Sequence, residues 1–102
     1  MSTPVVAIIT AKPGMEQQLE ANFRAVIGAT HAEEGCQVYQ LNRDTDNPRR
    51  FVWIEDWASR EHLDRHLATD HIKTLFASFA DLVESAEVVV LEHLAGGVAK
   101  GA

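Results

Sequence analysis

Two segments of helical periodicity are each enclosed by strand-forming runs, and this interleaving limits the fold more than any other feature of the chain. Apolar residues recur at helical spacing from Met15 to Ile27 and, most regularly, from Ile72 to Val83. The strand-forming runs are Val5–Ala11, Cys36–Arg43, Phe51–Trp57 and Ala86–Glu92. The predicted order is therefore strand, helix, strand, strand, helix, strand.

This order predicts an α+β domain of ferredoxin-like type. Two interleaved crossover connections place the four strands in one antiparallel sheet, with the helices on one face. The length of 102 residues suits one hydrophobic core. We expect a single domain over residues 1–94 and a flexible tail over residues 95–102, AGGVAKGA.

The first strand predicts that the other face of the sheet is apolar as well. Val5, Val6, Ile8 and Ile9 cannot all point to one side, because side chains alternate along a strand. An exposed apolar sheet face usually marks an interface. We therefore expect a homodimer in which two sheets pack face to face.

Composition and charge exclude several classes of function. The formal net charge is −6 and the nine Lys and Arg residues are scattered, so no basic stripe for nucleic acid or an anionic membrane surface is expected. No apolar run approaches the roughly 20 residues of a membrane span, and the N-terminus lacks the features of a signal peptide. Cys36 is the single cysteine, which excludes an intrachain disulfide. A cytoplasmic location is the expectation.

Turn and cap residues divide the second half of the chain. Asp44–Arg50 is rich in turn formers and predicts the turn of a hairpin. Ser59 is placed to cap a short helix that carries Leu63 and Leu67, and Thr69 to cap a longer one.

The third strand carries an acid among aromatic side chains. Alternation places Phe51, Trp53, Glu55 and Trp57 on one face. A carboxylate there loses solvation, so Glu55 is expected either to pair or to have a raised pKa. A purely structural role, with Glu55 bonded to a backbone amide or an arginine, is the alternative.

Histidines flank the predicted break between the two helices. Helical geometry places His66 at the edge of the buried stripe and His62 nearer to solvent. His71 falls at about the second position of the next helix, where the helix dipole disfavours an imidazolium, although Asp70 acts in the opposite direction. Both His66 and His71 are candidate bases, and the alternative is that they are boundary residues bonded to backbone.

Other kinds of site have little support in the sequence. His62 and His66 share a helix face at a spacing that suits a metal, but His62 is expected to face solvent, so no metal site is predicted. The chain has no Gly-rich phosphate loop and no nucleophile-elbow motif.

Two stretches of the chain carry a family resemblance: AKPGMEQQLE and HAEEGCQVYQLNRDTDNPRRFVWIEDWASREHLDRHLATDH. With them, the chain resembles the antibiotic biosynthesis monooxygenase domain family over about Val5 to His93. Its most specific positions are Glu34-Gly35-Cys36, Tyr39, Asn47-Pro48, Glu55, Trp57, Ser59, Leu63, His66 and His71. Members of this family are small dimeric α+β barrel proteins, which include quinol monooxygenases.

The resemblance implies an oxygenase that needs no flavin, haem or metal cofactor. A small aromatic or quinol-like substrate loses a proton and reacts directly with O2, so the protein supplies a base and a dry pocket. This implies His66 or His71 as the base and Glu55 as the orienting group. Trp53, Trp57, Tyr39 and Phe76 would then form the walls. The same residues would serve an isomerase or tautomerase of a small carbonyl compound, and a non-enzymatic ligand-binding dimer is the third alternative.

Overall fold

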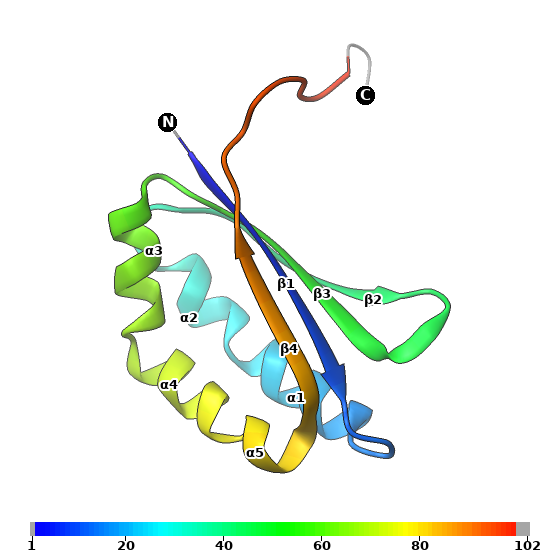
Figure 1. The fold of residues 1–102 in the computed structure, drawn as a ribbon. Coiled ribbons are helices and arrows are strands. Elements are labelled where there is room, and N and C mark those ends of the chain that lie inside the picture. Colours follow the sequence, from blue (N-terminus) through cyan, green and yellow to red (C-terminus); the bar gives the residue numbers. More distant parts are fainter. Residues whose placement is uncertain (1, 100–102) are drawn as a thin grey trace.

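The structure is a computed structural model that describes residues 2–99. Its strands are β1 (Thr3–Ala11), β2 (Cys36–Asp44), β3 (Asn47–Trp57) and β4 (Val83–Val90). Its helices are α1 (Glu16–Ala25), α2 (Ile27–His31), α3 (Arg60–Leu67), α4 (Asp70–Ala77) and α5 (Phe79–Leu82). The sheet is antiparallel throughout, in the order β2-β3-β1-β4. The helices cover one face and leave the other open (Figure 1), which confirms the predicted ferredoxin-like α+β fold.

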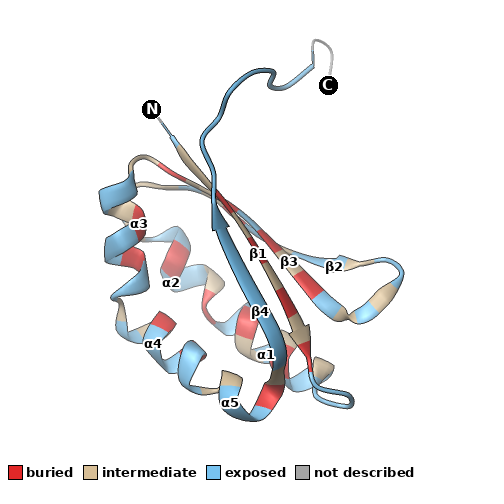
Figure 2. Cartoon of the chain, in the orientation of Figure 1, coloured by how far each residue is buried: buried red, intermediate tan, exposed pale blue. Residues whose placement is uncertain are grey.

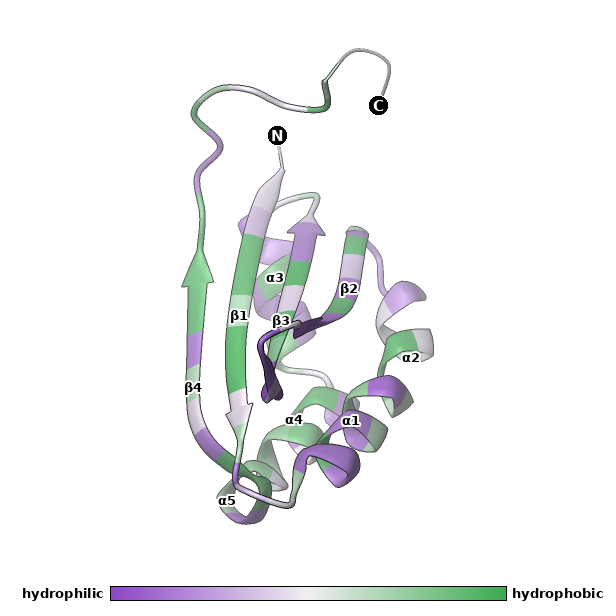
Figure 3. Ribbon diagram, turned by 90° about the vertical axis from the view of Figure 1, so that its right-hand side faces the viewer, coloured by the Kyte–Doolittle hydropathy of each residue, from purple (hydrophilic) through white to green (hydrophobic). Residues whose placement is uncertain are grey.

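Strand alternation separates a buried face from an open one. Val5 and Ile9 of β1 are buried against the helices, while Val6 and Ile8 are half-buried on the open face. Figure 2 shows the buried positions gathered where the sheet meets the helices. Figure 3 faces the open side of the sheet, where apolar colour runs along β1. The sequence-based expectation of two apolar faces is therefore correct for β1.

Both long helices of the prediction are interrupted. The first breaks at Val26, which separates α1 from α2, and the second breaks at Ser78, which separates α4 from α5. The Ser78 hydroxyl donates to the Leu75 carbonyl oxygen at 2.6 Å and so satisfies an acceptor at the end of α4. Periodicity could not reveal these breaks, because the apolar residues on both sides of each break still pack on the same core.

The hairpin turn is shorter than predicted. β2 continues to Asp44 and β3 begins at Asn47, so most of the predicted turn is strand. The Asp44 carboxylate accepts from the Asp46 backbone N–H at 2.8 Å, which tightens the turn. Pro48 is tolerated in β3 because the pairing with β1 reaches only to Arg50 and the pairing with β2 shifts register from Phe51 to Asn47, so neither neighbour pairs with Pro48.

The C-terminal strand and tail also differ from the predicted bounds. β4 begins at Val83 and ends at Val90, three and two residues before the respective predicted limits of Ala86 and Glu92. Residues 91–99 contain no helix or strand, and the rest of the predicted flexible tail, residues 100–102, lies outside the described residues. Over residues 2–99, no helix has the length and apolar character needed to cross a membrane.

Candidate functional site

Helix α3 places an imidazole inside the core. Ser59 begins the helix in extended conformation, and its hydroxyl accepts from the His62 N–H at 3.3 Å, as predicted for an N-cap. One turn later Leu63 is buried, and His66 follows on the same side with 3% of its side chain exposed. His66 is thus deeper than the predicted core edge. His62 is more exposed than His66, as expected, and its Nδ1 lies 2.7 Å from the Ser59 hydroxyl.

Glu33 joins the two candidate histidines. It lies in the loop between α2 and β2, and its Oε2 is 2.9 Å from His66 Nδ1 and 2.9 Å from His71 Nε2. A carboxylate oxygen only accepts hydrogen bonds, so this geometry places a hydrogen on each of these nitrogens. The other nitrogen of His66, Nε2, keeps its lone pair. Sequence reasoning missed Glu33, since a loop residue 33 positions from His66 has no periodic signal.

His71 is the second residue of α4, as predicted. Its Nε2 also lies 3.3 Å from the Thr30 hydroxyl and 3.4 Å from the Thr69 hydroxyl. Thr69 occupies the predicted N-cap position, but its hydroxyl donates to the His66 carbonyl oxygen at 2.7 Å instead of capping α4. The break between α3 and α4 thus lets both histidines hydrogen-bond to the Glu33 carboxylate.

Aromatic rings fix the orientation of the His66 imidazole. The Trp57 ring lies 4.5 Å from it at 34°, and the Tyr39 ring lies 5.3 Å from it at 69°. Tyr39 in turn packs on Trp53 at 4.4 Å. Trp57, Trp53 and Tyr39 are all buried. The imidazole therefore has little room to rotate away from Glu33.

Glu55 lies on the helix-covered face of β3, as predicted, with 8% exposure. Its Oε1 accepts a hydrogen bond from Trp57 Nε1 at 3.0 Å. Burial raises the pKa of Glu55, the bond from Trp57 opposes that change, and the nearby Glu33 adds to it. Glu55 thus both pairs and has a raised pKa. The carboxylate that holds the imidazoles is Glu33, whereas Glu55 bonds to a tryptophan.

Burial also sets the protonation of two neighbouring groups. It lowers the pKa of His66, and the hydrogen bond to Glu33 partly offsets this change, so the imidazole is neutral near pH 7. Burial, with the charge of Glu55, raises the pKa of Tyr39 well above its ordinary value. Tyr39 is therefore a neutral hydrogen-bond donor, and His66 is the group able to accept a proton.

A small cavity of about 40 Å³ lies between the sheet and helices α3 and α4. Tyr39, Glu55 and His66 supply its polar lining, while Trp53 and Phe76 are among its walls. Trp57, predicted as a wall, does not line it and lies behind His66. The exposed side chains of Leu67, Phe76 and Val88 form its outer part.

The cavity is small for an aromatic ligand. About 40 Å³ holds a water molecule, whereas pockets for small organic ligands usually measure hundreds of Å³. Phe76 is 44% exposed and Val88 55%, so these side chains can move outward without leaving a packed core. Entry of a substrate requires such a movement.

Glu33 and the two histidines that it joins are also the group best placed to hold a metal among the described residues. Donor atoms of Glu33, His66 and His71 lie within 4.8 Å of one another, and two histidines with a carboxylate suit zinc or iron. Their 2.9 Å separations are equally those of ordinary N–H···O hydrogen bonds. Of the histidine pair considered from sequence, His66 belongs to this group, whereas His62 does not and bonds to Ser59.

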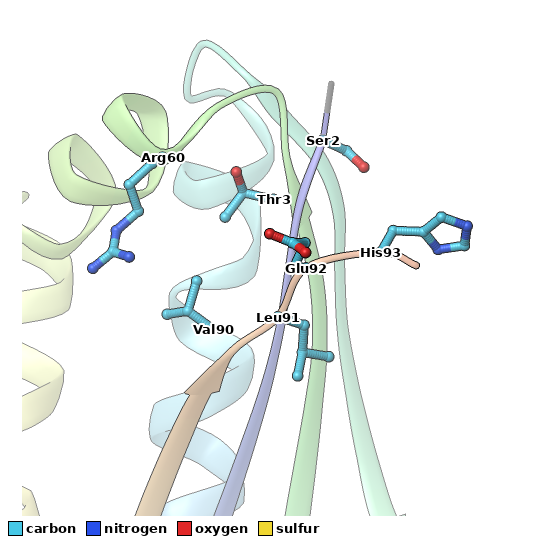
Figure 4. Close-up of a pocket in the computed structure, with 7 residues that line it drawn as sticks. All are labelled: Ser2, Thr3, Arg60, Val90, Leu91, Glu92 and His93. Atoms are coloured by element: carbon cyan, nitrogen blue, oxygen red, sulfur yellow. The ribbon is translucent and has the colours of Figure 1, made fainter. Parts of the chain in front are cut away.

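A larger hollow of about 480 Å³ lies where β1 begins and the chain leaves β4. Figure 4 shows that its ionisable side chains do not converge: Arg60 and His93 point to opposite sides. The smaller cavity, by contrast, brings an imidazole, a carboxyl group and a phenol together.

Comparisons with known proteins identify the relatives of this chain. The sequence model of the antibiotic biosynthesis monooxygenase family matches residues 4–78. The protein described as "Putative monooxygenase Rv0793" of Mycobacterium tuberculosis is 32% identical over 81% of this chain and 83% of its own length. The "Probable quinol monooxygenase YgiN" of Escherichia coli K12 is 32% identical over 68% of this chain and 76% of its own.

Solved structures show the same fold. PA3566 from Pseudomonas aeruginosa superposes with a TM-score of 0.88 at 32% identity, covering 92% of this chain and 95% of its own. The structure of Rv0793 from Mycobacterium tuberculosis superposes with a TM-score of 0.88 at 29% identity, covering 96% of this chain and 100% of its own. With the family model spanning most of the sheet and the helices that carry both histidines, the chain belongs to the antibiotic biosynthesis monooxygenase family.

Proposed function

We propose that this protein is a cofactor-independent monooxygenase that oxidises a small aromatic or quinol-like substrate with O2, and that His66 is its base. One observation carries the proposal. Buried His66 lines the cavity, while its Nδ1 lies 2.9 Å from the Glu33 carboxylate, which leaves Nε2 free to take a proton. The carboxylate also stabilises the imidazolium that forms, as in a Ser-His-Asp triad.

The reaction balances without an added reductant. A hydroquinone gives an O–H proton to His66, and a ring carbon of the resulting anion bonds to O2. Protonation gives a ring hydroperoxide, and loss of water from it leaves a hydroxyquinone. One oxygen atom enters the product, the other leaves as water, and the substrate supplies the electrons. Desolvation of the cavity raises the energy of the anion and favours its reaction with O2.

Oxygen consumption with a hydroquinone tests this proposal. We expect uptake that exceeds autoxidation, one labelled oxygen atom in the product when labelled O2 is used, and no return of O2 on addition of catalase. His66→Ala should remove the activity, since a general base contributes about 10²–10⁴-fold. His62→Ala, on the same helix but outside the cavity, is the matched control. Uptake that persists in His66→Ala would sink the mechanism.

An isomerase of a small carbonyl compound is the second candidate. A neutral imidazole and a buried carboxyl of raised pKa face one cavity, which is the base and acid pair that enolisation needs. Anaerobic exchange of substrate hydrogen for solvent deuterium separates the two. Exchange with turnover in the absence of O2 supports the isomerase, whereas exchange without product supports the oxygenase.

The open sheet face supports a homodimer as part of this proposal. Val6 and Ile8 of β1, Ile54 of β3 and Val89 of β4 lie on that face by register, and Ile54 is 45% exposed. Face-to-face packing of two such sheets would bury them. Light scattering should give twice the chain mass, and Ile54→Glu should give a folded monomer. A stable wild-type monomer would refute the packing.

A further inference from the structure

Among the described residues, the polar groups that line the cavity include no permanently positive side chain. Tyr39, Glu55 and His66 are the side chains with strongly polar groups that line it, and the other nine lining residues are apolar or aromatic. Within residues 2–99, no lysine or arginine lines the cavity. An anionic group on a ligand would therefore find no permanently positive partner there.

The walls that move to admit a ligand cannot replace that missing cation. The cavity of about 40 Å³ has room for a water molecule, and Phe76 and Val88, which must move outward to enlarge it, are apolar and offer no hydrogen bonds to a carboxylate or phosphate. Burying an unpaired anion is costly, and the acid already present makes it more so. Glu55 would be forced to keep its proton, or two negative charges would share one dry space.

His66 is a poor substitute counter-ion. An anionic ligand that drew a proton onto Nε2 would leave the imidazole unable to take a second one, so binding would be gained at the expense of the base. Glu33 already holds the opposite nitrogen at 2.9 Å. The negative charge needed for reaction is best created inside the cavity, by proton transfer from a substrate that enters uncharged.

We propose that the cavity accepts only uncharged substrates, hydroxylated aromatics or enols without a carboxylate, sulfate or phosphate group, and that Glu55 is the residue that enforces this selection. The inference rests on the proposed function only in treating this cavity as the substrate site. It separates this protein from oxygenases or isomerases whose substrates carry a phosphate handle.

Binding of a matched pair of ligands tests the proposal without any turnover. 2-Naphthol and 2-naphthyl phosphate share the ring and differ in charge, and quenching of Trp53, which lines the cavity, reports binding. The wild type is expected to bind the naphthol at least about 100-fold more tightly. Equal affinities, or no binding of the naphthol, would overturn the proposal.

Two variants assign the selection to its cause. Glu55→Gln keeps an acceptor for Trp57 and removes the acid. The ratio of the affinity for 2-naphthol to the affinity for 2-naphthyl phosphate should therefore fall by about tenfold or more. Val88→Lys adds a cation at the exposed edge of the cavity and should raise phosphate affinity about tenfold, with little change for the naphthol. Glu61→Gln, an equal charge change on the solvent side of α3, is the control.

The outcomes of these binding tests are distinguishable from failure of the proposed function. A ratio unchanged in Glu55→Gln contradicts the role of Glu55, even if a hydroquinone is oxidised. Naphthol binding with the expected ratio but without oxygen uptake supports the charge selection and contradicts the monooxygenase.

Discussion

Glu33 and His66 are 33 residues apart in the sequence, and their side chains meet at 2.9 Å. The two ring nitrogens of His66 therefore have different roles in the proposed mechanism. Nδ1 bonds to the carboxylate, which orients the ring, and Nε2 is left to act as base. We expect Glu33→Gln to lower kcat by at least about tenfold, since an amide cannot stabilise an imidazolium as a carboxylate does. Steady-state kinetics with KM little changed would agree. An unchanged kcat would show that Glu33 has only a structural role.

Trp57 should be needed for stability more than for contact with substrate. It is fully buried, and its Nε1–H is donated to Glu55 at 3.0 Å. Trp57→Phe leaves that carboxyl without its donor and opens a void, so the free energy of unfolding should fall by about 1–3 kcal/mol. Denaturant unfolding measures this change. Gln17→Ala on the exposed side of α1 is a comparison outside the core and should cost less.

Stability should depend on pH through Glu55. Its pKa is raised in the folded state, so the folded protein holds this proton at pH values where the unfolded chain has lost it. The contribution of Glu55 to stability is therefore fully present below its ordinary pKa of 4.5 and declines as pH rises through the folded pKa. Glu55→Gln, which has no proton to lose, should gain stability relative to wild type as pH rises from about 4 to about 7. Each tenfold difference in proton affinity between the folded and unfolded states corresponds to about 1.4 kcal/mol. A pH-independent difference in urea unfolding would contradict this.

Gly35 should not tolerate a side chain. Its φ is +84°, and a Cβ there would lie 2.3 Å from the His62 ring. Gly35→Ala should therefore destabilise the protein by more than about 1 kcal/mol and displace the loop that carries Glu33. Gly28→Ala, where a Cβ would meet nothing within 4 Å, is the control and should be neutral or stabilising. Thermal unfolding of the two variants gives the comparison.

Activity should survive removal of metal ions. The hydrogen-bonded arrangement of Glu33, His66 and His71 leaves His66 Nε2 free to accept a proton without any ion. Dialysis against a chelator, followed by oxygen-uptake assays, should leave the rate unchanged. Loss of activity that returns with one added divalent metal would show that these side chains are ligands instead.

The fold could be predicted from periodicity, because buried residues recur at every second position in a strand and at every third or fourth position in a helix. The alternation of Phe51, Trp53, Glu55 and Trp57 predicted the buried face of β3 correctly. The same reasoning missed the breaks at Val26 and Ser78, since a helix can stop and restart without changing which side is apolar.

The candidate site was predictable only where it lies on regular elements. His66 and His71 could be placed by helical geometry, but Glu33 could not, because its position depends on how an irregular loop returns to β2. The pairing of Glu55 with Trp57, two positions along one strand, was accessible in principle from their shared face. The pairing was not predicted, because a shared face does not specify which polar atoms meet.

The loop between α2 and β2 separates two properties of the proposed site in this chain. The proposed base lies on helix α3 and the cavity walls on the sheet and helices α3 and α4, whereas the carboxylate that bonds the base comes from a loop outside these elements. A change at Glu33 alters basicity without repacking the core, and a change at Val88 or Phe76 alters admission without touching the base. Acid–base strength and substrate choice can therefore evolve one residue at a time, on separate parts of the same small domain.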